Sequence, residues 1–459
     1  AAYTQLLTYS NAFGNSYWTK SGATIEGDAS TAGSELVTDG NPFVAGSWTL
    51  GAGWSVAGGD MISDGTSDGI SQSVMTIGKM YMITLDITAI SGGVYFTSAF
   101  FEGDATERLI NEVTGVTTYY QTAKSTSFGI FSVGGTITIN SVSVKEVTGF
   151  SSPSVDYPTD AYKLVEDLDV GQSHRVERSE SITNATTYTY SIIAKAGERT
   201  WTRIVAAANG QADAYFDLEN GVVGTVALGT AKIESLVNGW YRCSVTGTSN
   251  GTSLVLRYFT ATEDGTTTYN GDGTSGIYIF GANLSETTYA PPYAYTNGAT
   301  ATVTADVITG AGDATLFSSV NSSGVLFAEI AALANDGTIR VLNIGADASN
   351  YVRLYYRTDN NQVTARVRVG GVDRLLYNGS ITDATELNKF AIRWADTDYS
   401  YWINGTEVTT AVIGTTFPST TLTTLDFDDG VGTSPFYGNT SQLAVSNYLT
   451  DAQMITLTT

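Results

Sequence analysis

Tyrosine and arginine side chains alternate along two short segments near the C-terminus, NYVRLYYR at 350–357 and VTARVRV at 363–369. In both segments every second residue suits the core of a β-sandwich. The remaining residues would share one solvent-facing side of a sheet: Tyr351, Arg353, Tyr355, Arg357, Arg366 and Arg368. Guanidinium groups bind carboxylates and sulfates through paired hydrogen bonds, and tyrosine rings stack on sugar rings. The pattern favours a site for an acidic glycan, although contact with an acidic neighbouring subunit would use the same side chains.

Two acidic loops contain oxygen ligands that suit a structural calcium ion. They are EDGTTTYNGDGTSG at 263–276 and LDFDDG at 425–430. The candidate ligands are Glu263, Asp264, Asp272, Asp426, Asp428 and Asp429. Neither loop has EF-hand spacing, and Asp and Gly are also the residues that form turns. Calcium is therefore one of two explanations for these loops, and no motif requires any other cofactor.

The sequence offers few residues for catalysis. His174 is the only histidine, so any Ser-His-Asp or Cys-His arrangement would need it. It lies in GQSHRVERSE without a nucleophile elbow nearby, and we expect an exposed histidine at the end of a strand. A glycosidase needs only two carboxylates, so the sequence leaves a polysaccharide-degrading enzyme as one alternative function, beside the two described below. We expect a protein that is not an enzyme.

Composition and charge exclude several classes of protein. The 459-residue chain has a formal net charge of -23, which argues against nucleic-acid binding and against binding to anionic membranes. With 42% hydrophobic residues it is a folded protein, not a disordered acidic tail. Cys243 is the only cysteine, so an intramolecular disulfide is impossible. No 18 apolar residues occur in a row, and AAYTQLLTYS lacks the pattern of a secretory leader, so we expect no membrane insertion.

The elements that position these residues are β-strands. Apolar residues occur in short alternating runs between Gly, Asn, Ser and Thr, which is typical of all-β domains. One helix is expected, at the C-terminus after the capping residues Thr450 and Asp451. The length suits about three domains.

A segment that would form the start of a domain occurs twice. Asn, Phe and Trp recur with the same spacing in NAFGNSYW at 11–18 and NPFVAGSW at 41–48. Closing segments also occur as a pair, ITINSVSVKE at 137–146 and IYIFGANLSE at 277–286. No opening segment lies between the two closing segments. We therefore predict that one jelly roll is nested in a loop of another. Such an insertion is possible because the two termini of a domain usually lie close together.

The predicted boundaries follow from these segments. Residues 1–31 and 148–300 would form the host jelly roll, and residues 32–147 the inserted one. APPYAYTNGATATVTADV at 290–307 has the prolines and small polar residues of a linker. Residues 301–459 would then form a third sandwich, with strands such as FAIRWA and YSYWING.

Several segments resemble known proteins. LLTYSNAFGNSYWTKSG, AYFDLENGVVGT, NGWYRCSVT and GDGTSGIYIFGANL are similar to the β-sandwich modules of bacteriophage virion proteins, which are related to carbohydrate-binding modules. KFAIRWADTDYSYWINGTEV, with LTDAQ near the end, resembles laminin G and concanavalin A-like lectin sandwiches. The resemblance implies jelly-roll sandwiches followed by a concanavalin A-like sandwich. Together with the repeated segments, it gives an all-β chain in which one jelly roll is nested in another.

The resemblance also implies a setting. It indicates a non-enzymatic tail fibre, adhesin or head decoration protein, made in the host cytoplasm and displayed on the virion surface. Its partners would be other virion proteins and a host surface polysaccharide. A homo-oligomer is expected, because phage fibres are usually trimers. The alternative is a purely structural subunit that binds only other virion proteins.

Overall fold

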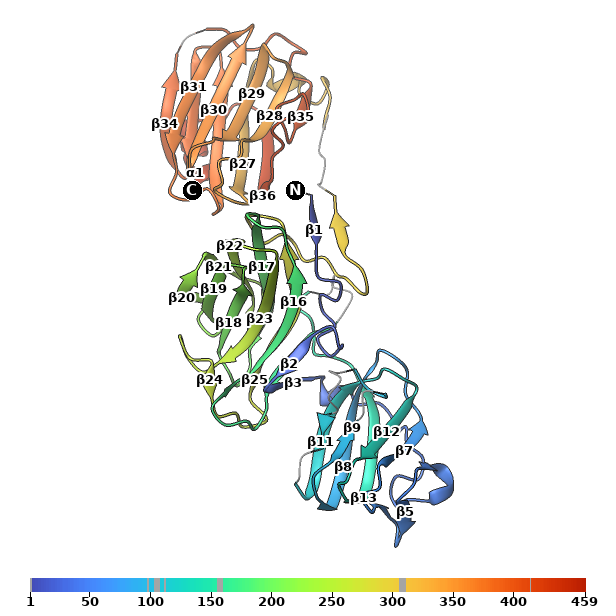
Figure 1. Ribbon diagram of the computed structural model, residues 1–459. Coiled ribbons are helices and arrows are strands. Elements are labelled where there is room, and N and C mark those ends of the chain that lie inside the picture. The colour runs from blue at the N-terminus through green and yellow to red at the C-terminus, as the bar shows by residue number, and fades with distance from the viewer. Residues whose placement is uncertain are drawn as a thin grey trace. The chain divides into compact units, whose positions relative to one another are not determined.

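The computed structural model describes residues 2–96, 99–102, 108–110, 113–154, 160–304, 311–412 and 414–459. These residues form β-sandwiches in two compact units, Tyr3–Val303 and Thr304–Thr459 (Figure 1). The predicted all-β class is confirmed. The expected C-terminal helix is α1 (Asp451–Thr458), which begins with a capping box between Thr450 and Gln453. Within the described ranges, no helix has the length and apolar character needed to cross a bilayer.

The first complete sandwich lies between residues 49 and 147. Its two sheets have the strand orders β10-β9-β12-β7-β4 and β11-β8-β13-β6-β5. The strands are β4 (Thr49–Leu50), β5 (Trp54–Ala57), β6 (Asp60–Ser63), β7 (Asp68–Ser73), β8 (Met80–Ile90), β9 (Val94–Phe96), β10 (Arg108–Leu109), β11 (Gly115–Thr122), β12 (Ser127–Ser132) and β13 (Ile137–Val147). Alternate residues of β8, including Ile83 and Leu85, fill the core between the sheets.

The second sandwich contains two six-stranded sheets, ordered β21-β22-β17-β25-β14-β3 and β2-β16-β23-β18-β19-β20. Its strands are β2 (Thr19–Ser21), β3 (Ala23–Glu26), β14 (Tyr162–Glu166), β16 (Arg175–Ser181), β17 (Thr187–Ala196), β18 (Trp201–Ala208), β19 (Ala212–Asp217), β20 (Val222–Leu228), β21 (Thr230–Ser235), β22 (Trp240–Thr248), β23 (Ser253–Ala261) and β25 (Gly276–Ser285). Two short ladders accompany them, β1 (Tyr3–Gln5) with β26 (Ala301–Val303) and β15 (Gln172–Ser173) with β24 (Thr268–Tyr269).

Strands from both sides of the first sandwich in the sequence pair within the second sandwich. Strands β2 and β3, which precede the first sandwich in the sequence, pair with β16 and β14, which follow it. The second sandwich is therefore the host, and its sheets contain chain from both sides of the inserted sandwich. Both β17 and β8 are interior strands of their sheets, next to the closing strands β25 and β13 respectively.

The repeated openings have the same local structure in the two sandwiches. Trp18 donates its indole N–H to the Tyr9 carbonyl at 2.8 Å, and Trp48 donates to the Asp39 carbonyl, also nine residues earlier, at 3.1 Å. Phe13 and Phe43 pack beside these tryptophans, with ring centroids 5.2 and 5.6 Å apart. The asparagines differ: Asn11 is buried and accepts from the Gly281 N–H, whereas Asn41 is exposed. The repeated Phe and Trp residues therefore have the same packing role in both sandwiches.

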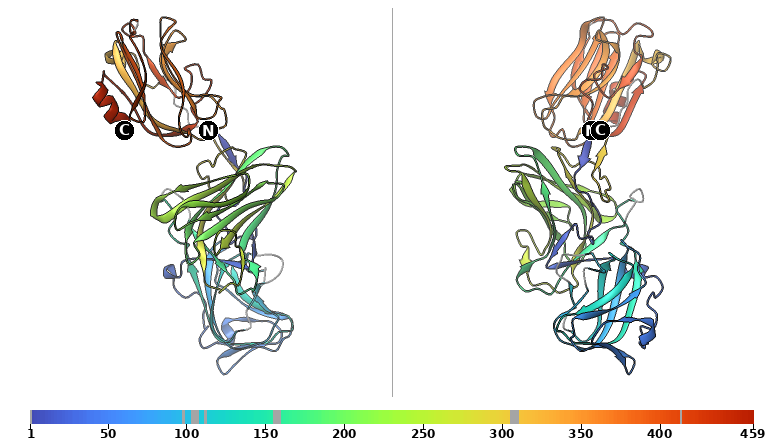
Figure 2. Two further views of the ribbon diagram at one scale, coloured as in Figure 1. Left: turned by 90° about the vertical axis from the view of Figure 1, so that its left-hand side faces the viewer. Right: turned by 45° about the vertical axis from the view of Figure 1, so that its right-hand side comes forward.

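The C-terminal sandwich packs the sheets β34-β33-β32-β27-β36 and β31-β30-β29-β28-β35 against each other. Its strands are β27 (Ser323–Ala332), β28 (Arg340–Asp347), β29 (Asn350–Tyr356), β30 (Gln362–Val369), β31 (Val372–Ser380), β32 (Asn388–Ala395), β33 (Asp398–Ile403), β34 (Thr406–Ala411), β35 (Thr424–Asp426) and β36 (Gly438–Ser446). Met454 of α1 packs with Phe327 and Trp402 on the outside of the first sheet. Figure 2 shows α1 as the red helix beside this sandwich, next to the C-terminus. Among the described residues no helix packs over the outer face of the second sheet, which carries the predicted tyrosines and arginines.

Four short 3₁₀ helices complete the described secondary structure. They are η1 (Ala29–Thr31), η2 (Ala45–Ser47), η3 (Val237–Gly239) and η4 (Ser318–Val320).

Candidate functional site

An open depression of about 160 Å³ lies on the outer face of the second C-terminal sheet. Four of the six residues predicted for the glycan face line it: Tyr351, Arg353, Tyr355 and Arg366. Four others complete it: Ile339, Val341, Asp429 and Ser434. The strand register explains the grouping, because Arg353 of β29 lies opposite Arg366 of β30 and opposite Asn343 of β28.

Arg353 is fixed in this depression by three contacts. Its Nε–H donates to Asn343 Oδ1 at 2.8 Å, and a terminal nitrogen donates to the carbonyl oxygen of Asp429. Its guanidinium carbon lies 3.9 Å from the centroid of the Tyr351 ring, a cation–π arrangement. Among the described residues Arg353 forms no ion pair with a carboxylate, and burial lowers the pKa of its guanidinium. The group is therefore a preorganised cation that makes no direct ion pair within the described residues, although the nearby Asp429 carboxylate attracts it electrostatically.

Arg366 differs from Arg353 because a carboxylate neutralises it. Its Nε and a terminal nitrogen donate to the two oxygens of Asp373 at 2.9 and 2.8 Å. This bidentate hydrogen bond raises the pKa of Arg366 above its ordinary value. Arg368 approaches the same carboxylate at 3.7 Å and does not line the depression. Two of the arginines expected to bind a ligand thus share one internal partner.

Tyr351 is the main correction to the expected face. Its side chain is on the outer side of the sheet, but only 3% of the residue is exposed because Arg353 covers its ring. It therefore supports the guanidinium and has no free face for a sugar. Tyr355 remains partly exposed at the edge of the depression and is the tyrosine that a ligand can reach.

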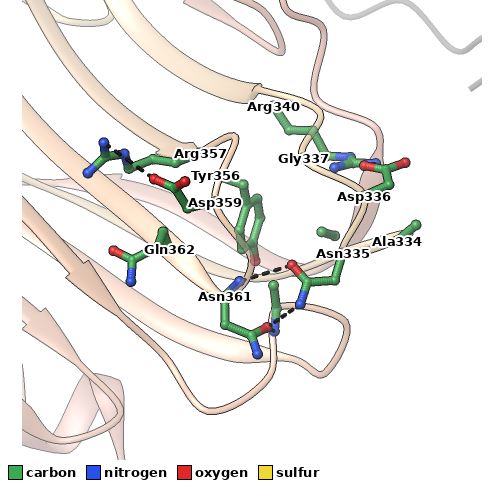
Figure 3. A pocket seen from close by; sticks show the side chains of 12 residues that line it. Ala334, Asn335, Asp336, Gly337, Arg340, Tyr356, Arg357, Asp359, Asn361 and Gln362 are labelled. Carbon is green, nitrogen blue, oxygen red and sulfur yellow. Dashed lines mark hydrogen bonds and ion pairs between the residues drawn. The ribbon is translucent and has the colours of Figure 1, made fainter.

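Arg357 lies elsewhere, beside a small pocket at the end of the same sheet (Figure 3). It approaches the Asp359 carboxylate at 3.8 Å. The side chains of Asn335 and Asn361 are hydrogen-bonded at 2.7 Å, and the Asn361 N–H donates to Asn335 at 2.9 Å. The pocket volume of about 10 Å³ is enough for one water molecule, not for a sugar.

The predicted calcium ligands mostly accept hydrogen bonds from nearby turns. Asp264 accepts from the backbone and hydroxyl of Thr225, and Asp272 from Thr274 and Ser275. Glu263 faces the Thr266 hydroxyl at 3.4 Å.

The second acidic loop behaves in the same way. Asp426 accepts from the Thr424 hydroxyl, Asp428 from the Gly430 N–H, and Asp429 from Thr433. Within the described ranges no three acidic, histidine or cysteine side chains gather as metal ligands. These bonds are what the turn interpretation expects, and calcium binding stays a prediction.

His174 is not exposed, contrary to expectation. Its ring is fully buried between the Gly22 carbonyl, which contacts Nδ1, and the Tyr269 carbonyl, 3.4 Å from Nε2. Glycines make this enclosure possible, because a Cβ at Gly271 would lie 2.8 Å from the imidazole Cε1. The histidine therefore joins the opening of the host sandwich to its later strands.

Part of the depression carries no signal in the sequence. Asp429 reaches Arg353 from 76 residues away, through a loop that only the folded sandwich brings over β29. Ile339 and Val341 read as ordinary strand residues, although Ile339 is 39% exposed. The strand alternation could identify the arginines and tyrosines, but not the loop that closes the site.

No family model matches the sequence, and no curated protein matches it. Among solved structures, the chain is similar to the Ruminococcus gnavus IT-sialidase CBM40 bound to α2,3-sialyllactose, with 15% identity over 30% of this chain and 83% of that chain and a TM-score of 0.26. It is also similar to CG-16, a homodimeric agglutinin from chicken liver, with 12% identity, 30% and 98% coverage and a TM-score of 0.19. Mouse laminin α1 domains LG4-5 align with 13% identity, 60% and 86% coverage and a TM-score of 0.24. At these identities and TM-scores the three structures assign no function to the chain.

Proposed function

We propose that the chain is a glycan-binding protein, and that its C-terminal sandwich binds a carboxylate-bearing sugar in the depression around Arg353. Arg353 is the observation that carries the proposal. It is fixed by Asn343, Asp429 and Tyr351, it is partly exposed, and within the described residues it has no carboxylate partner. A fixed guanidinium loses little side-chain entropy when it binds an anion, because its geometry is already set.

The other lining residues suit the rest of a sugar ring. Ile339 and Tyr355 supply exposed or partly exposed apolar surface, on which the C–H face of a sugar can pack. The Ser434 hydroxyl can donate and accept, as sugar hydroxyls also do. One carboxylate per ligand matches one uncompensated arginine, since Asp373 already neutralises Arg366. Further carboxylates on the same ligand would meet Arg366, which Asp373 already pairs, and would gain no second free guanidinium among the lining residues.

We also propose a setting for this activity, on the resemblance described above. The chain would be displayed on the surface of a bacteriophage virion as a tail fibre, adhesin or head decoration protein, and it would bind a bacterial envelope polysaccharide without cleaving it. Other virion proteins would hold it in place, and the assembled form would be a homo-oligomer. A structural subunit that binds only virion proteins is the rival.

Calorimetric titration of the full chain with oligogalacturonate tests the binding proposal. A charge-assisted hydrogen bond contributes about 1.5–3 kcal/mol, so Arg353→Gln should weaken binding by roughly 10- to 150-fold. Methyl esterification of the oligosaccharide removes its carboxylates and should weaken binding to a similar extent. Arg357→Gln is the matched control, because Arg357 follows the same strand but lies outside the depression. Unchanged affinity in Arg353→Gln, or no binding by the unaltered chain, would contradict the proposal.

A further inference from the structure

A second set of arginines and aromatic residues covers the outer face of the host sheet β2-β16-β23-β18-β19-β20. Val176, Ile204 and Tyr258 of this sheet belong to the core, so the residues next to them point to the opposite face. The register places four of these outward residues in one row across adjacent strands: Arg175, Phe259, Arg203 and Tyr215. Neighbouring strands lie about 4.8 Å apart, so the row is roughly 14 Å long.

The aromatic rings hold the guanidinium groups against the sheet. Arg175 lies 5.5 Å from the centroid of Phe259, and Arg203 lies 5.7 Å from the same ring on its other side in the row. Arg203 is also 5.0 Å from the centroid of Tyr215. Cation–π contacts at these distances restrain the arginine side chains before any ligand arrives.

Carboxylates cancel the charge of this row. Glu177 accepts from Arg175 Nε at 2.7 Å and from Arg257 Nε at 2.8 Å. Asp213 accepts two hydrogen bonds from Arg203, at 2.8 and 2.6 Å. The surface therefore alternates N–H donors with carboxylate acceptors. The Arg257 side chain is 33% exposed, and within the described residues only its Nε is bonded.

An indole ring lies beside these pairs. Trp201 is two residues before Arg203 on β18, so both side chains are on the same face, and Trp201 is partly exposed. Its ring lies against Gly224, where an added Cβ would be 2.6 Å from the indole. Any other residue at position 224 would place its Cβ against the indole, so Gly224 keeps the Trp201 ring accessible. Val222 and Leu228, about half exposed on edge strand β20, extend the apolar part of the face.

We propose that this face binds a neutral polysaccharide chain. Each sugar hydroxyl both donates and accepts, so neighbouring hydroxyls match the guanidinium–carboxylate pairs of the row. The C–H face of a sugar can pack on the partly exposed indole of Trp201, as apolar groups do on aromatic rings. An acidic sugar gains little from Arg175 and Arg203, because Glu177 and Asp213 already pair with them. Among the described arginines of this face, only Arg257 lacks a carboxylate of its own, since it shares Glu177 with Arg175. The site is separate from the Arg353 depression, and it does not rest on the function proposed for that depression.

An array of immobilised dextran, mannan, galactan and polygalacturonate, probed with the full chain in 0.5 M NaCl, tests this site. High salt screens exposed charge pairs but leaves neutral hydrogen bonding and stacking. We expect binding to at least one neutral polysaccharide by the unaltered chain and by Arg353→Gln. Trp201→Ala and Arg257→Gln should each reduce it at least tenfold. Arg178→Gln is the matched control, since Arg178 is equally exposed and also paired with a glutamate, but on the opposite face of β16.

Two measurements keep the test decisive. Thermal unfolding of Arg257→Gln should match that of the unaltered chain, because Glu177 keeps its bond to Arg175. If Trp201→Ala lowers the unfolding temperature strongly, the Arg257 variant alone decides. The proposal is overturned if no neutral polysaccharide is retained by the unaltered chain, or if retention survives both substitutions. It is also overturned if light scattering shows self-association that Arg257→Gln abolishes, since the face would then be an interface between copies.

Discussion

Replacing the two equivalent tryptophans one at a time should destabilise two different sandwiches. Trp18 is 1% exposed in the host core, where its ring packs against Phe13 and Tyr258. Trp48 is 6% exposed in the core of the inserted sandwich, beside Phe43 and Phe128. If the nested arrangement is correct, Trp18→Ala affects strands far along the chain, and Trp48→Ala does not.

The expected size follows from the area that is lost. A buried aromatic side chain removes about 150–250 Å² from water, which at about 25 cal/mol per Å² contributes roughly 4–6 kcal/mol. Trp→Ala substitutions in cores cost about 3–5 kcal/mol, in agreement with this range. Each change also leaves one carbonyl oxygen, of Tyr9 or Asp39, without its indole donor. A loss of 4 kcal/mol corresponds to roughly 10³-fold less protection against amide exchange.

Hydrogen exchange followed by mass spectrometry resolves the two sandwiches in the intact chain. Trp18→Ala should remove protection from β16 to β25 while strands β6 to β12 keep theirs. Trp48→Ala should do the reverse. Met80 and Val147 also pack into the host core, so peptides at the start of β8 and the end of β13 are assigned to neither group. Equal loss of protection in both sandwiches after Trp18→Ala would refute the nested account.

Acid should weaken the host sheet through Glu177, since Arg175 and Arg257 hold the pKa of Glu177 below its usual value although burial opposes them. The unfolded-state pKa of a glutamate is about 4.3, so the stabilisation is fully present above that pH and is lost as the pH falls through the lower folded-state pKa. Glu177→Gln should therefore be less stable than the unaltered chain at pH 7. Between pH 7 and 3 its unfolding temperature should fall less than that of the unaltered chain. Light scattering of the full chain should give a mass above that of one chain, as the proposed homo-oligomer requires; a monomer at high concentration would contradict self-assembly and favour attachment through a different protein.

Much of the fold could be predicted because its signals are local. The spacing of Phe13 and Trp18 repeats in Phe43 and Trp48, and both pairs are side-chain anchors within about ten residues of chain. Strand alternation likewise placed Val352 and Leu354 in the core. Asn11 and Asn41 have equivalent places in the sequence repeat but not in the structure. Asn11 accepts a hydrogen bond from Gly281, and no local pattern indicates this contact.

The candidate site could be predicted only in part, for the same reason. Alternation identifies which residues share a face, but not which of them a neighbour covers, so Tyr351 was expected to be exposed. Its burial depends on Arg353, whose position depends in turn on Asp429 from a distant loop. The host face was missed because Glu177 and Arg257, its central pair, are 80 residues apart in the sequence.

The most direct test of glycan binding is an exchange footprint of the full chain with and without oligogalacturonate. The account predicts slower amide exchange at residues 339–343 and 351–355 and in the loop around Asp429, because these segments line the depression. No slowing should occur there in Arg353→Gln at the same ligand concentration, while Arg357→Gln should give the same footprint as the unaltered chain. Protection confined to other segments, or a footprint that persists without Arg353, would contradict the central claim.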